Sequence, residues 1–370
     1  MTDREPKFDR EPKIDRGRDS ALVSANGRNG RNREETLMTD STRRTILAGT
    51  LAASTLAGTR AGAEAGAAPD ATRTPAQAPG YYRYRVGEAR VTAVTDGVNT
   101  FPLPERFVLN ADRAAVSAAL VADFRHGASL TVPFTPLVIE TGGRRIVIDT
   151  GNGEAAFQAS QGAVGQFHAN LRMAGFDRAA IDTVVISHFH GDHVNGLLTA
   201  DGQLAFPNAE ILVPEPEWAY WMDDGAMSRA PAGRLQDGFR NARRVFDALA
   251  RKVTPYAWDR EILPGLTALG APGHTPGHTA FLLASGSESL FVQSDVTNVP
   301  VLFARNPGWH VMYDQDPAMA EATRRRIYDR IATERTLLQG FHYPFPAVGH
   351  LEKTAQGYRE VLVPWNPVLR

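Results

Sequence analysis

The sequence predicts an α/β fold built in layers. Short apolar strands alternate along the chain with segments of helical spacing, and polar loops follow the strand ends. The composition, 43% hydrophobic and 22% charged, is typical of a globular protein. The 370 residues can form one large domain or two smaller ones. The net charge of −1 provides no overall field that would favour nucleic acid or an anionic membrane.

The absence of cysteine limits the chemistry of the chain. Without cysteine there are no disulfides, no iron–sulfur clusters and no thiolate zinc sites. Any metal ion must therefore be held by histidine and aspartate, which suit zinc and similar divalent ions.

Residues 1–80 are predicted to form a leader outside the fold. The charged repeat "DREPKFDREPKIDR" cannot bury enough apolar surface to order itself. Met38 is a second candidate start, because the twin arginines Arg43 and Arg44, the apolar stretch "ILAGTLAASTLAGT" and small-residue cleavage options follow it in order. This order predicts twin-arginine export, hence a periplasmic or secreted protein with no stable membrane anchor. The alternative is an Ala-rich leader that contains an arginine pair by chance.

The folded domain is predicted over residues 81–370 and opens with strands. "RVTAVTDG" alternates polar and apolar residues and ends in an Asp-Gly turn. "PLVIE" and "RRIVID", joined by Gly142 and Gly143, predict a hairpin. "GQFHANLRMAGF" has helical spacing, whereas "TVVIS" is apolar throughout and predicts a buried strand.

The second half of the chain continues the alternation. "AEILVPEPEWAYWMDD" predicts a strand and then a helix, and "LQDGFRNARRVFDALARKV" predicts another helix. "LTALGAPGH", "AFLLASG" and "SLFVQSDV" predict strands with turns. "DPAMAEATRRRIYDRIATER" predicts a helix with Asp316 as its N-cap and Pro317 at its first position. "TLLQGFHYPFP" predicts the last strand, which runs into a loop.

The segment "HFHGDH" at 188–193 places three histidines and an aspartate directly after a buried strand. In an extended segment, residues two apart point the same way, so His188 and His190 can address one metal ion. Gly191 is expected to let the chain turn, so that Asp192 and His193 address a second ion. A surface loop rich in histidine is a weaker interpretation, because apolar spacing resumes at "VNGL".

"SHFHGDHVNGL" resembles the signature loop of the metallo-β-lactamase superfamily, and the other motifs of that family follow in order. "APGHTPGHT" resembles the loop that carries the next ligand, "FVQSDVTN" the strand end with the bridging aspartate, and "GFHYPFPAVGH" the last ligand segment. "VIDTG" resembles the family's Asp-Thr-Gly turn beneath the site. The likeness runs from about residue 85 to the C-terminus.

The resemblance implies a four-layer αββα sandwich with two divalent metal ions, expected to be zinc, at one edge. It assigns His188, His190 and His274 to the first ion, and Asp192, His193 and His342 to the second, with Asp295 bridging them. Asp192 and Asp295 are accordingly the catalytic assignments. Asp149 and His278 are expected to support the ligands from behind. Two such ions lower the pKa of a shared water, so that a metal-bridging hydroxide can attack an ester-like bond.

The tail and the "TDGVNTFPLPERFVLN" opening resemble the methyl parathion hydrolase and acyl-homoserine-lactone lactonase branch. This branch implies a hydrophobic lactone, aryl ester or phosphotriester as the small-molecule substrate, and no nucleic-acid partner. Four aromatic residues are candidate pocket walls: Phe134, Trp218, Trp221 and Phe345. The alternatives are a glyoxalase II-type thioesterase, a β-lactamase-like hydrolase and a metal-loaded binding protein without turnover. A homodimer is compatible with the sequence.

Overall fold

The computed structural model describes residues 79–249 and 252–369. The predicted leader lies outside these residues apart from its last two positions, so the division at residue 80 and the export signal stay predictions. The described residues lie in the unit Ala71–Arg370.

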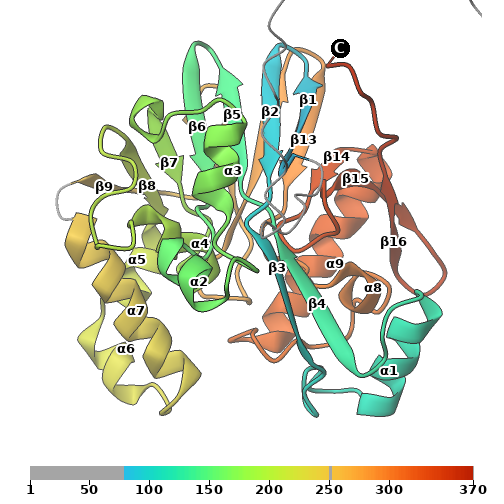
Figure 1. The fold of residues 1–370 in the computed structure, drawn as a ribbon. Helices are drawn as coiled ribbons and strands as arrows, with labels where there is room; N and C mark the ends of the chain where they lie inside the picture. The colour runs from blue at the N-terminus through green and yellow to red at the C-terminus, as the bar shows by residue number, and fades with distance from the viewer. Residues whose placement is uncertain (1–78, 250–251, 370) are drawn as a thin grey trace, which may run out of the picture. The chain divides into compact units, whose positions relative to one another are not determined.

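The first sheet has seven strands in the order β1-β2-β5-β6-β7-β8-β9 (Figure 1). Strands β6 to β9 run parallel to one another, whereas β1, β2, β5 and β6 pair antiparallel. Their bounds are β1 Tyr81–Val86, β2 Ala89–Val94, β5 Leu137–Thr141, β6 Arg144–Ile148, β7 Thr183–Val185, β8 Glu210–Pro214 and β9 Val253–Tyr256.

The second sheet also has seven strands, in the order β10-β11-β12-β13-β14-β15-β16. All neighbouring pairs are antiparallel except β13 and β14, which are parallel. The bounds are β10 Arg260–Leu263, β11 Leu266–Gly270, β12 Thr279–Ser285, β13 Glu288–Val292, β14 Leu337–Gln339, β15 Val348–Lys353 and β16 Tyr358–Leu362.

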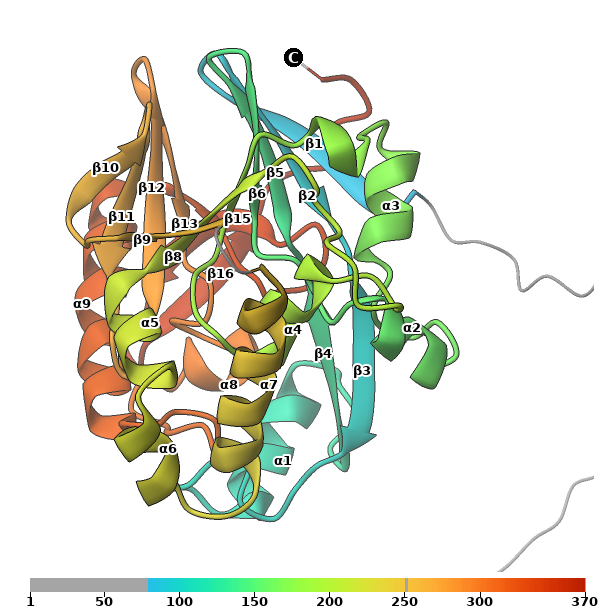
Figure 2. The ribbon, with the colours of Figure 1, turned by 90° about the vertical axis from the view of Figure 1, so that its left-hand side faces the viewer.

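The two sheets pack face to face, and helices cover their outer faces (Figure 2). α3 (Phe167–Met173), α5 (Glu215–Trp221) and α7 (Arg234–Leu249) contribute to the core outside the first sheet. α9 (Pro317–Glu334) packs outside the second sheet. The remaining short helices are α1 Arg113–Ala122, α2 Glu154–Ala159, η1 Arg178–Ala180, α4 Gly191–Val194, η2 Asn195–Leu197, α6 Asp224–Arg229 and α8 Pro300–Phe303.

Successive apolar side chains in the central strands point alternately to the two cores, and this produces the layering. In β6, Ile146 and Ile148 face the core between the sheets, whereas Val147 faces the helices. In β7, Val185 and Val184 divide in the same way. Because successive strand residues point to opposite faces, a strand buried on both sides must be apolar throughout. The predicted αββα sandwich is confirmed.

Several predicted elements agree with the structure in detail. The β5–β6 hairpin turns at Gly142 and Gly143, whose φ angles of 55° and 75° explain the two glycines. Helix α9 begins with Pro317, and the Asp316 side chain accepts a hydrogen bond from the Met319 N–H.

Other predictions about the elements were incomplete or wrong. β14 is not the last strand, because β15 and β16 follow it and extend the second sheet. The sequence also gave no sign of the two-stranded arm formed by β3 (Gly97–Pro102) and β4 (Ser129–Phe134). This arm packs with α1 and α8 in a separate apolar cluster. Among the described residues, no helix has the length and apolar character needed to cross a membrane.

Candidate metal centre

The predicted ligands meet where strands of both sheets end. Each lies in a loop or short helix that follows a strand, and these segments gather at one edge of the sandwich. Asp149 follows β6, and His188 and His190 follow β7; Asp192 and His193 lie in α4, His274 between β11 and β12, Asp295 after β13, and His342 after β14.

The "HFHGDH" loop combines an extended segment with a helix start. His190 is the residue before α4, with φ −68° and ψ 152°, so the chain is extended up to that point. Asp192 and His193 then lie within the first turn of α4. The chain turns at Gly191, as expected, and it does so by entering a helix of which Gly191 is the first residue. The change from extended chain to helix redirects the second pair of side chains.

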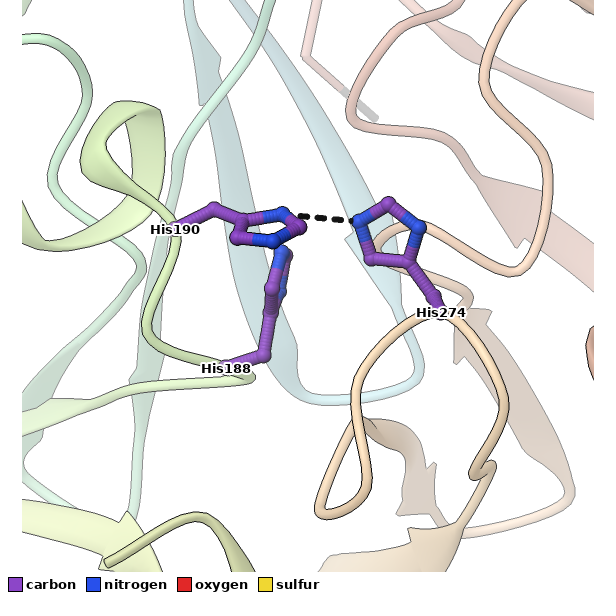
Figure 3. A group of neighbouring side chains, drawn as sticks. All are labelled: His188, His190 and His274. Atoms are coloured by element: carbon purple, nitrogen blue, oxygen red, sulfur yellow. Dashed lines mark hydrogen bonds between the residues drawn. The ribbon is translucent and has the colours of Figure 1, made fainter. Parts of the chain in front are cut away.

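The histidines and aspartates form three overlapping groups whose ligand atoms lie within 4.8 Å of one another. We call His188, His190 and His274 the first ligand group, and Asp192, His193 and His342 the second. His188, His193 and Asp295 form the third group, which links the other two. Figure 3 shows His190 and His274 pointing toward each other from separate loops, with 2.9 Å between His190 Nδ1 and His274 Nε2.

Asp295 lies between the two groups. Its Oδ2 is 3.2 Å from His274 Nε2 and 3.1 Å from His342 Nε2, and its Oδ1 is 3.3 Å from His193 Nε2. Asp192 Oδ2 lies 3.5 Å from His342 Nε2 and 3.6 Å from His193 Nε2. The structure thus brings all seven predicted ligands together, with Asp295 in the position expected of a bridge.

Hydrogen bonds outside the centre fix which nitrogen of each histidine faces inward. Nδ1 of His193 lies 2.8 Å from Asp149 Oδ2, and Nδ1 of His274 lies 2.8 Å from Asp314 Oδ1. Nδ1 of His342 lies 2.9 Å from the Pro133 carbonyl. Because these oxygens accept from Nδ1–H, each ring directs its Nε2 at the centre.

Asp149 holds the start of the loop from behind, as expected. It accepts hydrogen bonds from the Ser187 N–H and the Ser187 hydroxyl, both at 2.8 Å, as well as from His193. The Ser187 hydroxyl in turn lies 3.1 Å from His188 Nδ1. Asp149 is 1% exposed and has a φ of 59°, a left-handed conformation that aspartate and asparagine tolerate better than most residues.

His278 also supports the centre, through the backbone of Asp295. Its Nδ1 donates to the Ala271 carbonyl at 2.9 Å, and its Nε2 accepts from the Asp295 N–H at 2.9 Å. Both ring nitrogens are therefore engaged, and burial lowers the pKa of His278 to about 3. A neutral His278 positions Asp295 and has no free nitrogen for a metal ion.

The donor set fits divalent cations. His188 Nε2, His193 Nε2 and Asp295 Oδ1 are buried atoms without a hydrogen-bond partner in the described part of the chain, and all three belong to one group. Burial and the neighbouring imidazoles lower the pKa of His188 well below its usual value, so its lone pair is free. Imidazole nitrogens together with carboxylate oxygens are a donor set suited to zinc. The burial of so many polar atoms is compensated when cations lie among them.

A cavity of about 770 Å³ opens beside the centre. Phe134 and Trp221 line it, as predicted, together with Phe101, Tyr220 and Tyr313. Its polar lining includes Arg234 and several amide side chains. The cavity therefore combines aromatic walls with hydrogen-bonding groups next to the predicted metal ligands.

Two of the predicted wall residues do not line this cavity. Trp218 packs into the core outside the first sheet, 5.7 Å from Phe246 between ring centroids. Phe345 lies in the loop after His342 and is 39% exposed. Tyr220 and Trp221, at the end of α5, line the cavity, whereas Trp218, almost one turn earlier, packs against Phe189 and Phe246.

The sequence analysis also missed residues that contact the ligands. Asp314 accepts from His274, but no motif links the two residues, which are 40 positions apart. Phe341 stacks on His193, with ring centroids 3.9 Å apart. Phe341 directly precedes His342 in "GFHYPFP", and this position next to a predicted ligand could have indicated that it contacts the centre.

The family model of the metallo-beta-lactamase superfamily matches residues 135–327. The chain belongs to the metallo-β-lactamase superfamily. It is accordingly a hydrolase, and the alternative of a binding protein without turnover is not supported.

Curated relatives in the superfamily include the N-acyl homoserine lactonase of Bacillus thuringiensis. It is 26% identical over 243 residues, which cover 61% of this chain and 86% of the relative. The N-acyl homoserine lactonase AttM of Azorhizobium caulinodans is 31% identical over 120 residues, which cover 31% of this chain and 40% of the relative. The predicted resemblance to the lactonase branch is confirmed.

Solved structures of the superfamily share the fold. AidC, a dizinc quorum-quenching lactonase in complex with a product, superposes with a TM-score of 0.72 at 24% identity, covering 78% of this chain and 98% of AidC. The hydrolase AbOPH superposes with a TM-score of 0.72 at 23% identity, covering 79% of this chain and all of AbOPH. At these identities, the likeness supports the fold alone.

Proposed function

We propose that this protein is a lactonase that uses two divalent metal ions, which we expect to be zinc. Its proposed substrates are hydrophobic lactones that carry an acyl amide. The observation that carries this proposal is the convergence of two ligand groups around Asp295 beside an aromatic cavity. The curated relatives named N-acyl homoserine lactonase support the substrate class. When bound, two such ions supply an activated water and a Lewis acid for the carbonyl oxygen.

The chain's own residues would hold and orient the reacting groups. Asp295 lies within about 3.3 Å of histidines from both ligand groups, so it keeps the two positions close together. The buried Nδ1–H bonds of His193 and His274 to Asp149 and Asp314 keep the ligating nitrogens directed inward. These hydrogen bonds restrain the ligating side chains beneath the cavity, which favours one orientation of the scissile bond.

The cavity lining favours a neutral substrate with an apolar tail and an amide. Phe134 and Trp221 offer apolar area for an acyl chain, at about 25 cal/mol per Å² buried. Asn298 Oδ1 and Gln315 Nε2 are buried polar atoms without a partner among the described residues, and both residues line the cavity. An acceptor and a donor of this kind match the N–H and C=O of an acyl amide. Arg234 is the only arginine or lysine among the described residues that line the cavity, which argues against a multiply charged glutathione thioester.

A substrate panel tests this proposal. The zinc-loaded protein should be assayed with an N-acyl homoserine lactone, an aryl ester, a phosphotriester and S-lactoylglutathione under the same conditions. We expect the highest kcat/KM for the lactone, with phosphotriester cleavage as a side activity. A preference for S-lactoylglutathione would assign the protein to the glyoxalase II branch. The Asp295→Ala variant is the control for hydrolysis that does not depend on the centre.

Export is a second part of the proposal. The twin arginines Arg43 and Arg44 and the apolar stretch that follows support a periplasmic or secreted location. Twin-arginine export carries folded proteins, which suits a protein that takes up metal ions before it leaves the cytoplasm.

A further inference from the structure

Glu217 is a fully buried carboxylate that belongs to neither ligand group. It lies in the first turn of α5 and is 0% exposed. Its Oε1 accepts a hydrogen bond from the Phe189 N–H at 3.1 Å, and its Oε2 accepts one from the Gly277 N–H at 3.0 Å. One side chain therefore contacts two loops that are far apart in the sequence.

These two loops carry the whole first ligand group. Phe189 lies between His188 and His190, so its N–H belongs to the peptide unit that joins it to His188. Gly277 lies three residues after His274. Because each carboxylate oxygen accepts from a different loop, the length of the Glu217 side chain limits how far the two loops can separate.

Close packing of α5 on the second loop supports this constraint. A Cβ atom added to Gly277 would lie 2.2 Å from Glu217 N and 2.7 Å from Glu217 Cα. Any side chain at Gly277 would therefore push the loop away from α5. On the other side, the buried Phe189 ring packs against Phe246 with centroids 4.1 Å apart. At the points where Glu217 bonds them, the second loop therefore packs against α5 and the first against α7.

A direct backbone bond already joins the bases of the two loops. The Thr279 N–H donates to the Ser187 carbonyl at 3.1 Å. Glu217 joins the same two loops at a second point, nearer the ligands. A single bond lets one loop pivot against the other, whereas two bonds fix both the distance and the angle between the loops. A buried carboxylate with neutral donors is costly on its own, and nearby cations offset that cost.

We propose that Glu217 is a positioning residue that sets the separation of the His188–His190 segment from His274 and so controls the affinity of the first ligand group for its ion. This inference rests on the proposed two-metal function. It predicts that changing Glu217 weakens the first position selectively and leaves the second nearly unchanged.

Zinc titration in two backgrounds tests the inference. The His342→Ala background leaves the first ligand group intact, and the His190→Ala background leaves the second. We expect Glu217→Gln to weaken zinc binding about 10- to 100-fold in the first background and by less than about threefold in the second. Glutamine keeps the size of the side chain, but its NH2 group faces one of the two N–H donors.

Controls separate positioning from general destabilisation. Ile139→Ala opens a cavity in the core between the sheets, far along the sequence from both loops, and should lower Tm without changing zinc affinity in either background. Gly277→Ala disturbs the same contact from the opposite loop. It should weaken zinc binding selectively in the His342→Ala background, as Glu217→Gln does, and it provides the test if Glu217→Gln does not fold.

The outcomes distinguish this inference from the proposed function. If neither background binds zinc with Glu217 intact, the two-metal centre itself fails. If both bind zinc, and Glu217→Gln weakens both equally or neither, the positioning role of Glu217 is overturned.

Discussion

Replacing Asp149 tests the support behind the metal centre. Three donors bond to its carboxylate at 2.8 Å: the Ser187 N–H, the Ser187 hydroxyl and His193 Nδ1–H. Asparagine retains one carbonyl oxygen and presents an NH2 group to at least one of these donors. A buried donor without an acceptor costs about 1–3 kcal/mol, so we expect Asp149→Asn to lower the free energy of unfolding by about that amount.

Alanine at the same position should cost far more. It leaves all three donors without an acceptor, for about 3–9 kcal/mol at the same cost per donor. Asp149 also has a φ of 59°, which asparagine accepts readily and alanine resists by roughly 1–2 kcal/mol. The total approaches the whole stability of many proteins, about 5–15 kcal/mol. We therefore expect little folded Asp149→Ala protein.

Thermal unfolding and zinc titration measure both effects. A loss of 1 kcal/mol lowers Tm by about 2–4 °C in proteins somewhat smaller than this one. Zinc affinity of the second ligand group should fall about 10- to 100-fold in Asp149→Asn, because His193 is no longer held in one tautomer. Asp182→Asn is the control, since Asp182 is an exposed carboxylate that bonds one backbone N–H of the same sheet. Unchanged Tm and zinc affinity in Asp149→Asn would refute the reasoning.

Three further outcomes are expected. Asp295→Ala should reduce kcat/KM more than any single histidine change, because Asp295 lies against both ligand groups; wild-type activity would remove it from the site. Arg43→Lys combined with Arg44→Lys should retain the precursor in the cytoplasm, and unchanged export in cell fractionation would point to another route or to none. Burial opposes charging of His274, but Asp295 and Asp314 raise its pKa to about 9. Zinc uptake at neutral pH should then release a proton, and the stability of the metal-free protein should fall as pH rises from about 6.5 through about 9. Titration calorimetry in buffers of different ionisation enthalpy, and unfolding measured against pH, check both effects; no proton release would contradict the assignment.

The fold and the first four candidate ligands could be predicted because their signals are local in the sequence, whereas His274, Asp295 and His342 were assigned only through the family resemblance. The apolar runs of β6 and β7 and the "HFHGDH" spacing each lie within a few neighbouring residues. The supports of the ligands could not be predicted in the same way, because Asp314 meets His274 only through the tertiary fold. The prediction of the cavity-wall residues was partly wrong for a related reason. Trp218 and Tyr220 are two residues apart on α5, and only the packing of that helix decides which of them faces the cavity.

The origin of the ligands in both sheets links metal content to the completeness of folding. The predicted ligands run from His188 to His342, and they come together only after β14 has joined the second sheet and the two sheets have packed. A chain that stops before β14, or whose sheets have not packed, presents at most fragments of the site. If the proposed zinc centre is right, the ratio of bound zinc to protein under excess zinc therefore reports the fraction of molecules that have finished folding, and under the proposed twin-arginine route this protein would leave the cytoplasm with its ions already in place.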